Sequence, residues 1–248
     1  MKLHIRKIIL NPLILVICTT LLSLQSYSQV SDATFFDQSN EFFSKYVDVN
    51  GMVGYTDIKE NPSLLNQLYD QIGKHEVSDK SADYLKAFYT NAYNILVIKQ
   101  VVERYPIDGP LTVNGFFDKI QHNVAGEELT LNQVEKDKNL YVNKDERLHF
   151  ALVCAAISCP PLANFAFYPD KINEQLEART ILALNHPEFI RSTKKGAELS
   201  QIFNWYQDDF KDSAGSGVIE YINNFRKKQI PIDQKIVYYE YNWLLNKK

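Results

Sequence analysis

LHFALVCAAISCPPL, the stretch from Leu148 to Leu162, says more about this chain than any other segment. An apolar run carries a histidine near its start, the thiol of Cys154, and a second thiol at Cys159, which is followed by two prolines. Apolar residues on all sides indicate a buried segment. The stretch therefore predicts a core element that also holds the best candidate chemistry in the chain.

A cysteine nucleophile needs a thiol with a lowered pKa, a base beside it and a third group that orients the base. His149 and Cys154 are five residues apart, which places them about 140° apart around a helix and on opposite faces of a strand. Any couple must therefore be built by the fold, through a bend or with another histidine. Glu135 is our candidate to orient His149 through a tertiary contact.

Two structural interpretations of Cys154 compete with the nucleophile. Free cysteine is often buried as a small hydrophobic residue. Alternatively, Cys154 and Cys159 form a disulfide, which requires Cα atoms within about 6.8 Å and therefore a turn between them. Two cysteines are too few to replace a hydrophobic core. We expect a binding or structural role, with a cysteine-dependent hydrolase or acyl transferase of peptidase or transglutaminase type as the alternative.

Residues 1–28 have the pattern of a cleaved export signal. Lys2, Arg6 and Lys7 precede an apolar stretch at 13–24, and Ser26 and Ser28 provide the small residues of a cleavage site. The apolar stretch is shorter than the roughly 20 residues of a membrane span. We expect a periplasmic or secreted protein with no membrane span after cleavage. Such compartments are oxidising and permit a disulfide.

Composition limits the remaining classes. Loss of residues 1–28 removes three of the 27 basic side chains and none of the 30 acidic ones, which leaves a formal charge of −6. Nucleic-acid binding needs a basic face and is disfavoured. No linker or repeat divides residues 29–248, so a single domain is the simplest organisation.

Hydrophobic periodicity predicts mostly helices. The expected helices span 34–48, 63–72, 81–105, 172–184 and 217–226, with Ser81 and Thr130 as N-caps, Thr130 opening a short helix that contains Glu135. Hairpins are expected at 119–130 and around Lys195-Gly196, a short extended segment at 53–58 and a final strand at 236–243. This pattern is α+β: a mostly helical single domain with short β-hairpins.

Two further groups of residues are candidates to line a pocket. Asn91 and Asn94 lie on an otherwise apolar face of the 81–105 helix, where buried amides must be hydrogen-bonded. They either tie loops to the core or face a pocket. Trp205 and Asp209 belong to an aromatic and acidic segment that either fills the core or forms the wall of a groove for a peptide or sugar.

Several motifs in fixed order resemble the DUF547 family. They are KAFYTNAYN (86–94), TLNQVE (130–135), RLHFALVCAAISCPP (147–161), FNWYQDDF (203–210) and YNWLLN (241–246), the last with asparagine at 242 where the family usually has aspartate. The resemblance extends over nearly the whole chain after residue 28. It implies a single exported domain, as in many bacterial members, and no particular activity, because the family is uncharacterised.

Other ligand classes find no support in the sequence. It contains no glycine-rich phosphate loop and no GxSxG motif, so we expect no cofactor. It contains no HxxxH, HExxH or CxxC spacing, so we expect no metal. The expected partner is a small molecule or peptide whose identity these residues do not reveal.

Overall fold

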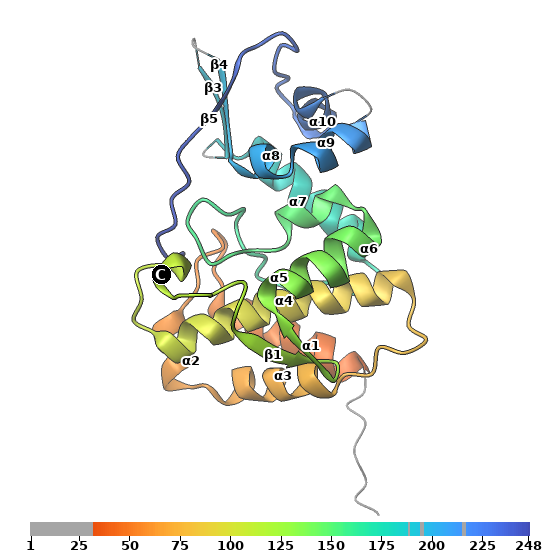
Figure 1. Cartoon of the computed structure of the whole chain (residues 1–248), viewed down its shortest axis with the longest axis vertical. Coiled ribbons are helices and arrows are strands. Elements are labelled where there is room, and N and C mark those ends of the chain that lie inside the picture. The colour runs from red at the N-terminus through yellow and green to blue at the C-terminus, as the bar shows by residue number, and fades with distance from the viewer. Residues whose placement is uncertain (1–31, 188, 194–195, 215–216) are drawn as a thin grey trace, which may run out of the picture.

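A computed structural model describes residues 32–187, 189–193, 196–214 and 217–248. The long helix α4 (Ala82–Arg104) crosses the middle of the molecule and contacts helices on both sides (Figure 1). Ser81 caps it by accepting a hydrogen bond from the Tyr84 amide, and it ends before Pro106. Its burial along almost the whole length makes α4 the organising element of the fold.

One side of α4 is covered by the N-terminal elements. Helices α1 (Asp32–Tyr46), α2 (Tyr55–Glu60) and α3 (Ser63–Lys74) pack there, and the antiparallel hairpin of β1 (Gln121–Val124) and β2 (Glu127–Thr130) joins α3. A short 3₁₀ helix, η1 (Pro110–Thr112), links α4 to this hairpin.

The other side of α4 carries the remaining elements. Chain order there is α5 (Leu131–Glu135), the π-helical turn η2 (Lys136–Leu140), α6 (Tyr141–Asn143), the 3₁₀ helix η3 (Glu146–Phe150) and α7 (Ile172–Asn185), then β3 (Ile190–Thr193), β4 (Gly196–Leu199), α8 (Ile202–Trp205), α9 (Gln207–Ala214), α10 (Val218–Phe225) and β5 (Ile236–Tyr238). Strands β3 and β4 are antiparallel, and β5 pairs with β4 in parallel.

The C-terminal segment, residues 239–248, connects the two sides. It descends from β5 past the edge of the molecule and ends beside α2 (Figure 1). Isolated bridges join Lys247 to Val53 and Leu245 to Ala156. Residues 242–245 are thereby brought against residues 156–158, in the loop that carries Cys154 and Cys159.

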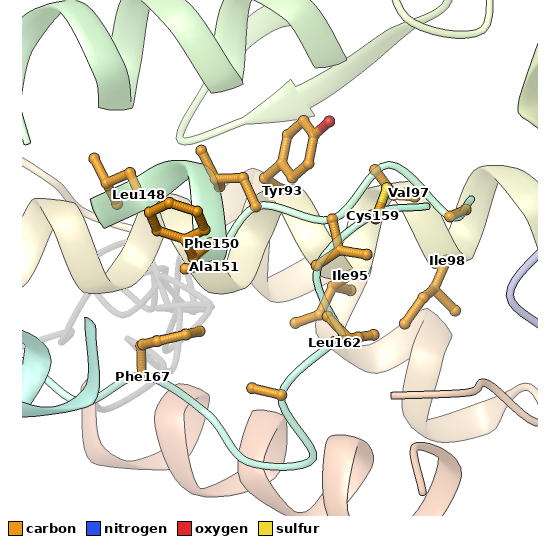
Figure 2. Packing of buried hydrophobic residues seen from close by; sticks show 14 of the residues in the cluster. Tyr93, Ile95, Val97, Ile98, Leu148, Phe150, Ala151, Cys159, Leu162 and Phe167 are labelled. Atoms are coloured by element: carbon orange, nitrogen blue, oxygen red, sulfur yellow. The ribbon is translucent and has the colours of Figure 1, made fainter. Parts of the chain in front are cut away.

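The 148–162 stretch is buried in the core against α4, as its apolar character predicted. Figure 2 shows Leu148, Phe150 and Ala151 lying along α4, with Leu162 and Phe167 nearby. Leu148 and Phe150 are fully buried. The chain leaves η3 as an irregular loop, and Ala155 adopts a left-handed φ of 63°. This turn supplies the bend that neither a helix nor a strand would allow.

Most predicted elements are confirmed, and the fold class is α+β as predicted. Two local predictions are wrong: 55–60 is the helix α2 and not an extended segment, and the strand expected at 236–243 ends at Tyr238. The last backbone bond to β4 runs from the Tyr239 amide to the Leu199 carbonyl, and the chain then turns toward residues 156–158. The predicted export signal, residues 1–28, and Lys195 of the second hairpin lie outside the described residues.

Within the described residues, none of the helices combines the length and apolar character that crossing a membrane requires.

Candidate functional site

A cavity of about 290 Å³ lies where α5, η3, the Cys154 loop, α8 and the C-terminal segment meet. Its lining contains the cysteine pair, one carboxylate, one imidazole and a set of aromatic side chains, namely Tyr93, Phe117, Asn132, Glu135, His149, Leu152, Cys154, Cys159, Pro160, Ile202, Trp205, Tyr206, Tyr241 and Trp243. We refer to it as the Cys154 pocket. It brings together four of the candidate residues, Glu135, His149, Cys154 and Trp205, and its lining residues lie up to 150 positions apart in the chain.

Asn94 holds the loop that carries Cys154. Its amide donates to the Ala151 carbonyl at 2.9 Å and accepts from the Val153 amide at 3.0 Å. Asn91 makes the equivalent pair with Phe167, and both side chains are buried. Neither asparagine lines the Cys154 pocket; each hydrogen-bonds loop backbone that has no ladder partner.

A buried ion network anchors η3, the element that carries His149. Lys86 on α4 lies 2.9 Å from Asp145, which also receives two hydrogen bonds from the Arg147 guanidinium. Burial raises the pKa of Asp145, but the hydrogen bonds from Arg147 and Lys86 outweigh it, so that pKa lies below its usual value. The Asp145 side chain also caps η3 by accepting from the Arg147 amide.

Cys154 and Cys159 form a disulfide with Cα atoms 6.4 Å apart. The left-handed turn at Ala155 permits this approach. Cys154 is half-buried and Cys159 is buried. The Tyr241 hydroxyl donates to Cys159 Sγ at 3.2 Å and lies 3.5 Å from Cys154 Sγ. While the disulfide is intact, Cys154 has no thiolate to serve as a nucleophile.

Asp209, and not Glu135, is the carboxylate that contacts His149. Imidazole Nε2 lies 2.8 Å from Asp209 Oδ2. The imidazole is buried, with ring centroids 4.1 Å from Tyr206 and 5.2 Å from Phe210, whereas the Asp209 side chain is 48% exposed. The ring is thus held by one hydrogen bond and two aromatic contacts. An imidazole oriented by a carboxylate is one arrangement that can serve in acid–base chemistry.

Both oxygens of Glu135 accept hydrogen bonds from tyrosines. Tyr206 donates at 3.0 Å and Tyr93 at 3.2 Å. Figure 2 shows the Tyr93 hydroxyl pointing away from the apolar cluster. Burial and then the Glu135 carboxylate raise the pKa of each tyrosine well above its usual value. The hydroxyls therefore remain protonated donors. They fix Glu135 in position, and no salt bridge to Glu135 forms within the described part of the chain.

Aromatic side chains from three separate segments form another part of the pocket lining. Trp205 from α8 packs on Trp243 and Tyr241 of the C-terminal segment, with centroids 5.9 and 5.0 Å apart. Trp243 also reaches Phe117, 6.5 Å away. Trp205 is 48% exposed, so it lies at the rim and does not fill the core as one interpretation of its segment expected; Phe210 does that.

Sequence reasoning did not single out Tyr93 and Tyr241 as site residues, and it included Tyr206 only as a member of the aromatic and acidic segment around Trp205 and Asp209. Tyr93 adjoins the Asn91 and Asn94 pair, and Tyr206 and Tyr241 belong to the quoted aromatic motifs. The signal was therefore present, but tyrosines on apolar faces usually fill the core. Only the contacts with Glu135 and the disulfide distinguish them.

No set of three or more His, Cys, Asp or Glu side chains converges to hold a metal ion in the part of the chain that the structure describes. Both oxygens of Glu135 accept hydrogen bonds from tyrosine hydroxyls, and His149 contacts one carboxylate, that of Asp209. The site therefore offers a disulfide, an imidazole–carboxylate unit, a fixed carboxylate and aromatic rings.

Comparison with known proteins adds one match. Residues 77–181 match the model of a family described as "Protein of unknown function, DUF547". No curated protein and no solved structure matches the chain. The matched stretch includes Glu135, His149 and the cysteine pair, whereas Trp205, Asp209, Tyr241 and Trp243 lie beyond it. The matched stretch is shorter than the resemblance inferred from the sequence motifs, which extended over nearly the whole chain after residue 28. Residues 77–181 of this chain are thus a DUF547 domain, a type of domain whose function is unknown.

Proposed function

We propose that the Cys154 pocket binds a small molecule or peptide through a cationic group of the ligand. The observation that carries the proposal is the environment of Glu135, a carboxylate that lines the pocket and, among the described residues, accepts hydrogen bonds from tyrosine hydroxyls. The lining contains no lysine or arginine among the described residues. A ligand cation would provide the missing counter-charge.

The tyrosine hydroxyls strengthen the preference for a donor. Tyr93 and Tyr206 direct their hydrogens at Glu135, and Tyr241 directs its hydrogen at a sulfur. Their oxygen lone pairs and the carboxylate are acceptors. An ammonium or guanidinium group matches such a surface, because it donates hydrogen bonds and accepts none.

The aromatic rings favour the same ligand. Trp205, Tyr241 and Trp243 lie in mutual contact at the pocket, and Trp205 is partly exposed to an arriving ligand. The faces of indole and phenol rings attract cations by about 0.5–2 kcal/mol each. Together with Glu135, they would select a lysine-like or arginine-like side chain, an amine or an amino sugar over an anion.

Calorimetry with a matched pair of ligands tests the proposal. Nα-acetyl-lysine amide and Nα-acetyl-norleucine amide have side chains of similar length and differ in the terminal ammonium. The lysine compound should bind at least roughly tenfold more tightly, and Glu135→Gln should remove most of that difference, since a hydrogen bond to a charged group contributes about 1.5–3 kcal/mol. Equal affinities for the two compounds would refute the proposal.

Glu60→Gln is the matched control. Glu60 is an exposed carboxylate on α2 and does not line the pocket. Its replacement removes the same charge from the protein and should leave the affinity for the lysine compound unchanged. A similar loss of affinity in both variants would show that net charge, and not the pocket, causes the effect.

A second candidate is a cysteine-dependent hydrolase or acyl transferase. The observation in its favour is that Cys154 and His149 line one pocket, while Asp209, which is not part of the lining, contacts the imidazole. This activity requires the reduced protein. It predicts that hydrolysis of an activated thioester or p-nitrophenyl ester appears on reduction and is abolished by both Cys154→Ser and His149→Ala. Activity that survives Cys154→Ser in the reduced protein would exclude it.

A further inference from the structure

The two sulfurs of the disulfide have different surroundings. Cys154 is half-buried in the wall of the Cys154 pocket. Cys159 is 8% exposed, and its Sγ accepts hydrogen bonds from the Cys154 amide at 3.1 Å and from the Tyr241 hydroxyl at 3.2 Å. The Tyr241 hydroxyl is nearer to Cys159 Sγ than to Cys154 Sγ, which lies 3.5 Å away. A disulfide that only cross-links a core needs neither an opening beside it nor two hydrogen-bond donors on one sulfur.

We propose that this disulfide is a thiol–disulfide exchange site, at which a small thiol entering the Cys154 pocket attacks Cys154 Sγ and Cys159 leaves as the thiolate. The proposal goes beyond ligand binding and does not depend on the charge of the ligand. Its substrates are low-molecular-weight thiols and their disulfides.

Each step is an exchange between sulfurs. The thiolate RS⁻ forms a bond with Cys154 Sγ while the Sγ–Sγ bond breaks, and the electron pair of that bond goes to Cys159. A second thiolate then attacks the small-molecule sulfur of this mixed disulfide. The disulfide RSSR is released, and the electron pair of the broken bond leaves Cys154 as a thiolate. Two thiols are oxidised to one disulfide, and the protein disulfide is reduced to a dithiol. The reverse reaction starts from Cys154 and an external disulfide.

Hydrogen bonds decide which sulfur leaves. Cys159 also lines the Cys154 pocket and borders a neighbouring cavity of about 660 Å³, so access to the two sulfurs alone does not settle the direction. The sulfur that leaves develops negative charge, and this charge is most stable on the sulfur that already accepts hydrogen bonds. The Cys154 amide and the Tyr241 hydroxyl meet Cys159 Sγ, and a thiolate with two donors is a better leaving group.

Burial fixes the Tyr241 hydroxyl as a donor. Burial raises the pKa of Tyr241 well above its usual value, and its ring packs against both Trp205 and Trp243. Tyr241 is therefore a positioning residue that supplies a proton-bearing group to the leaving sulfur.

Mapping the mixed disulfide on the wild-type protein tests the proposal. The folded protein is incubated with 2-mercaptoethanol, a neutral thiol that avoids any charge preference of the pocket, and is quenched with iodoacetamide. Mass spectrometry should find mercaptoethanol on Cys154 and the carbamidomethyl group on Cys159. Mercaptoethanol on Cys159, or no reaction until denaturant is added, would overturn the proposal.

A pair of tyrosine variants tests the leaving-group argument. Tyr241→Phe should slow formation of the mixed disulfide roughly tenfold, since it removes a donor to a charged sulfur. Tyr239→Phe is the control, because the Tyr239 hydroxyl donates to the Phe189 carbonyl and its ring does not line the Cys154 pocket. Equal rates in wild type and both variants, with all three folded by circular dichroism, would contradict the assigned role of Tyr241.

The exchange proposal and the cation-binding proposal are tested independently. If calorimetry detected no preference for a cationic ligand, the outcomes expected for 2-mercaptoethanol would be unchanged.

Discussion

At the scale of single residues, Asn94 has a stronger structural effect than its position in an apolar helix face suggests. Asn94→Ala leaves the Ala151 carbonyl and the Val153 amide without partners in a buried loop. Each unsatisfied buried group costs about 1–3 kcal/mol. The free energy of unfolding, from urea denaturation, should therefore fall by about 2–4 kcal/mol.

Asn66→Ala is the control for this variant. Asn66 is exposed on α3, and its side chain accepts a hydrogen bond from Lys99. Its replacement should change the free energy of unfolding by less than about 0.5 kcal/mol. If Asn94→Ala were equally harmless, Asn94 would not hold the Cys154 loop.

The sequence identified some of these residues but not their partners. Burial of Asn91 and Asn94 follows from helix periodicity, as does the need for hydrogen bonds. The pairing of His149 with Asp209 does not, because 60 residues separate them and nothing local favours Asp209 over Glu135. Tertiary packing of α9 on η3 makes that choice.

At the scale of elements, Lys86 fastens α4 to η3. Lys86→Met should lower the free energy of unfolding by about 1–3 kcal/mol, because Asp145 stays buried with Arg147 as its remaining ionic partner. Lys99→Met is the comparison, since Lys99 pairs with Glu103, whose side chain is 45% exposed. That exposed pair should contribute less than about 1 kcal/mol. Equal losses in urea denaturation would show that the Lys86 pair has no special role.

Capped elements were predictable, and elements fixed by tertiary contacts were not. Ser81 and Thr130 begin helices as predicted, and Gln133 completes the capping box with Thr130. Residues 53–58 look extended from their residue types, yet Tyr55 begins a helix because its buried ring and its hydroxyl contact with Asn246 fix the chain there. That contact spans 191 residues and leaves no local trace in the sequence.

At the scale of the whole molecule, a buried histidine ties stability to pH. His122 on β1 is 3% exposed, with Nε2 2.8 Å from the Gln100 amide oxygen. Burial lowers the pKa of His122 to about 4, against about 6.5 in an unfolded chain. Between these values the unfolded chain binds a proton that the folded protein does not. Stability is therefore full above pH 6.5 and falls as pH drops toward 4.

The loss should be on the order of 2–3 kcal/mol over this interval. Urea denaturation at pH 7.0, 5.5 and 4.5 measures it. His122→Gln retains an amide near Gln100 and removes the titrating group, so the difference between its stability at pH 7.0 and 4.5 should be smaller than in the wild type. An unchanged difference would mean that His122 does not cause the pH dependence.

The fold class of the molecule followed from its helix and hairpin patterns. The path of the C-terminal segment, which joins the two sides of the molecule, did not. The C-terminal segment crosses from β5 to α2 and brings Tyr241 and Trp243 to the Cys154 pocket (Figure 1). A predicted final strand up to residue 243 would have kept these side chains in a sheet. Bonds to Ser158, Ile157 and Asp108 hold the segment instead, and they become visible only once the chain is folded.

Tryptophan fluorescence gives the most direct measurement of ligand binding in this pocket. The chain has two tryptophans, Trp205 and Trp243, and both line the Cys154 pocket. Titration with Nα-acetyl-lysine amide should change their emission saturably, while Nα-acetyl-norleucine amide should have little effect, and Glu135→Gln should remove the response. A response of equal size to both compounds, or no response to the lysine compound in the folded protein, would contradict a cation-binding pocket.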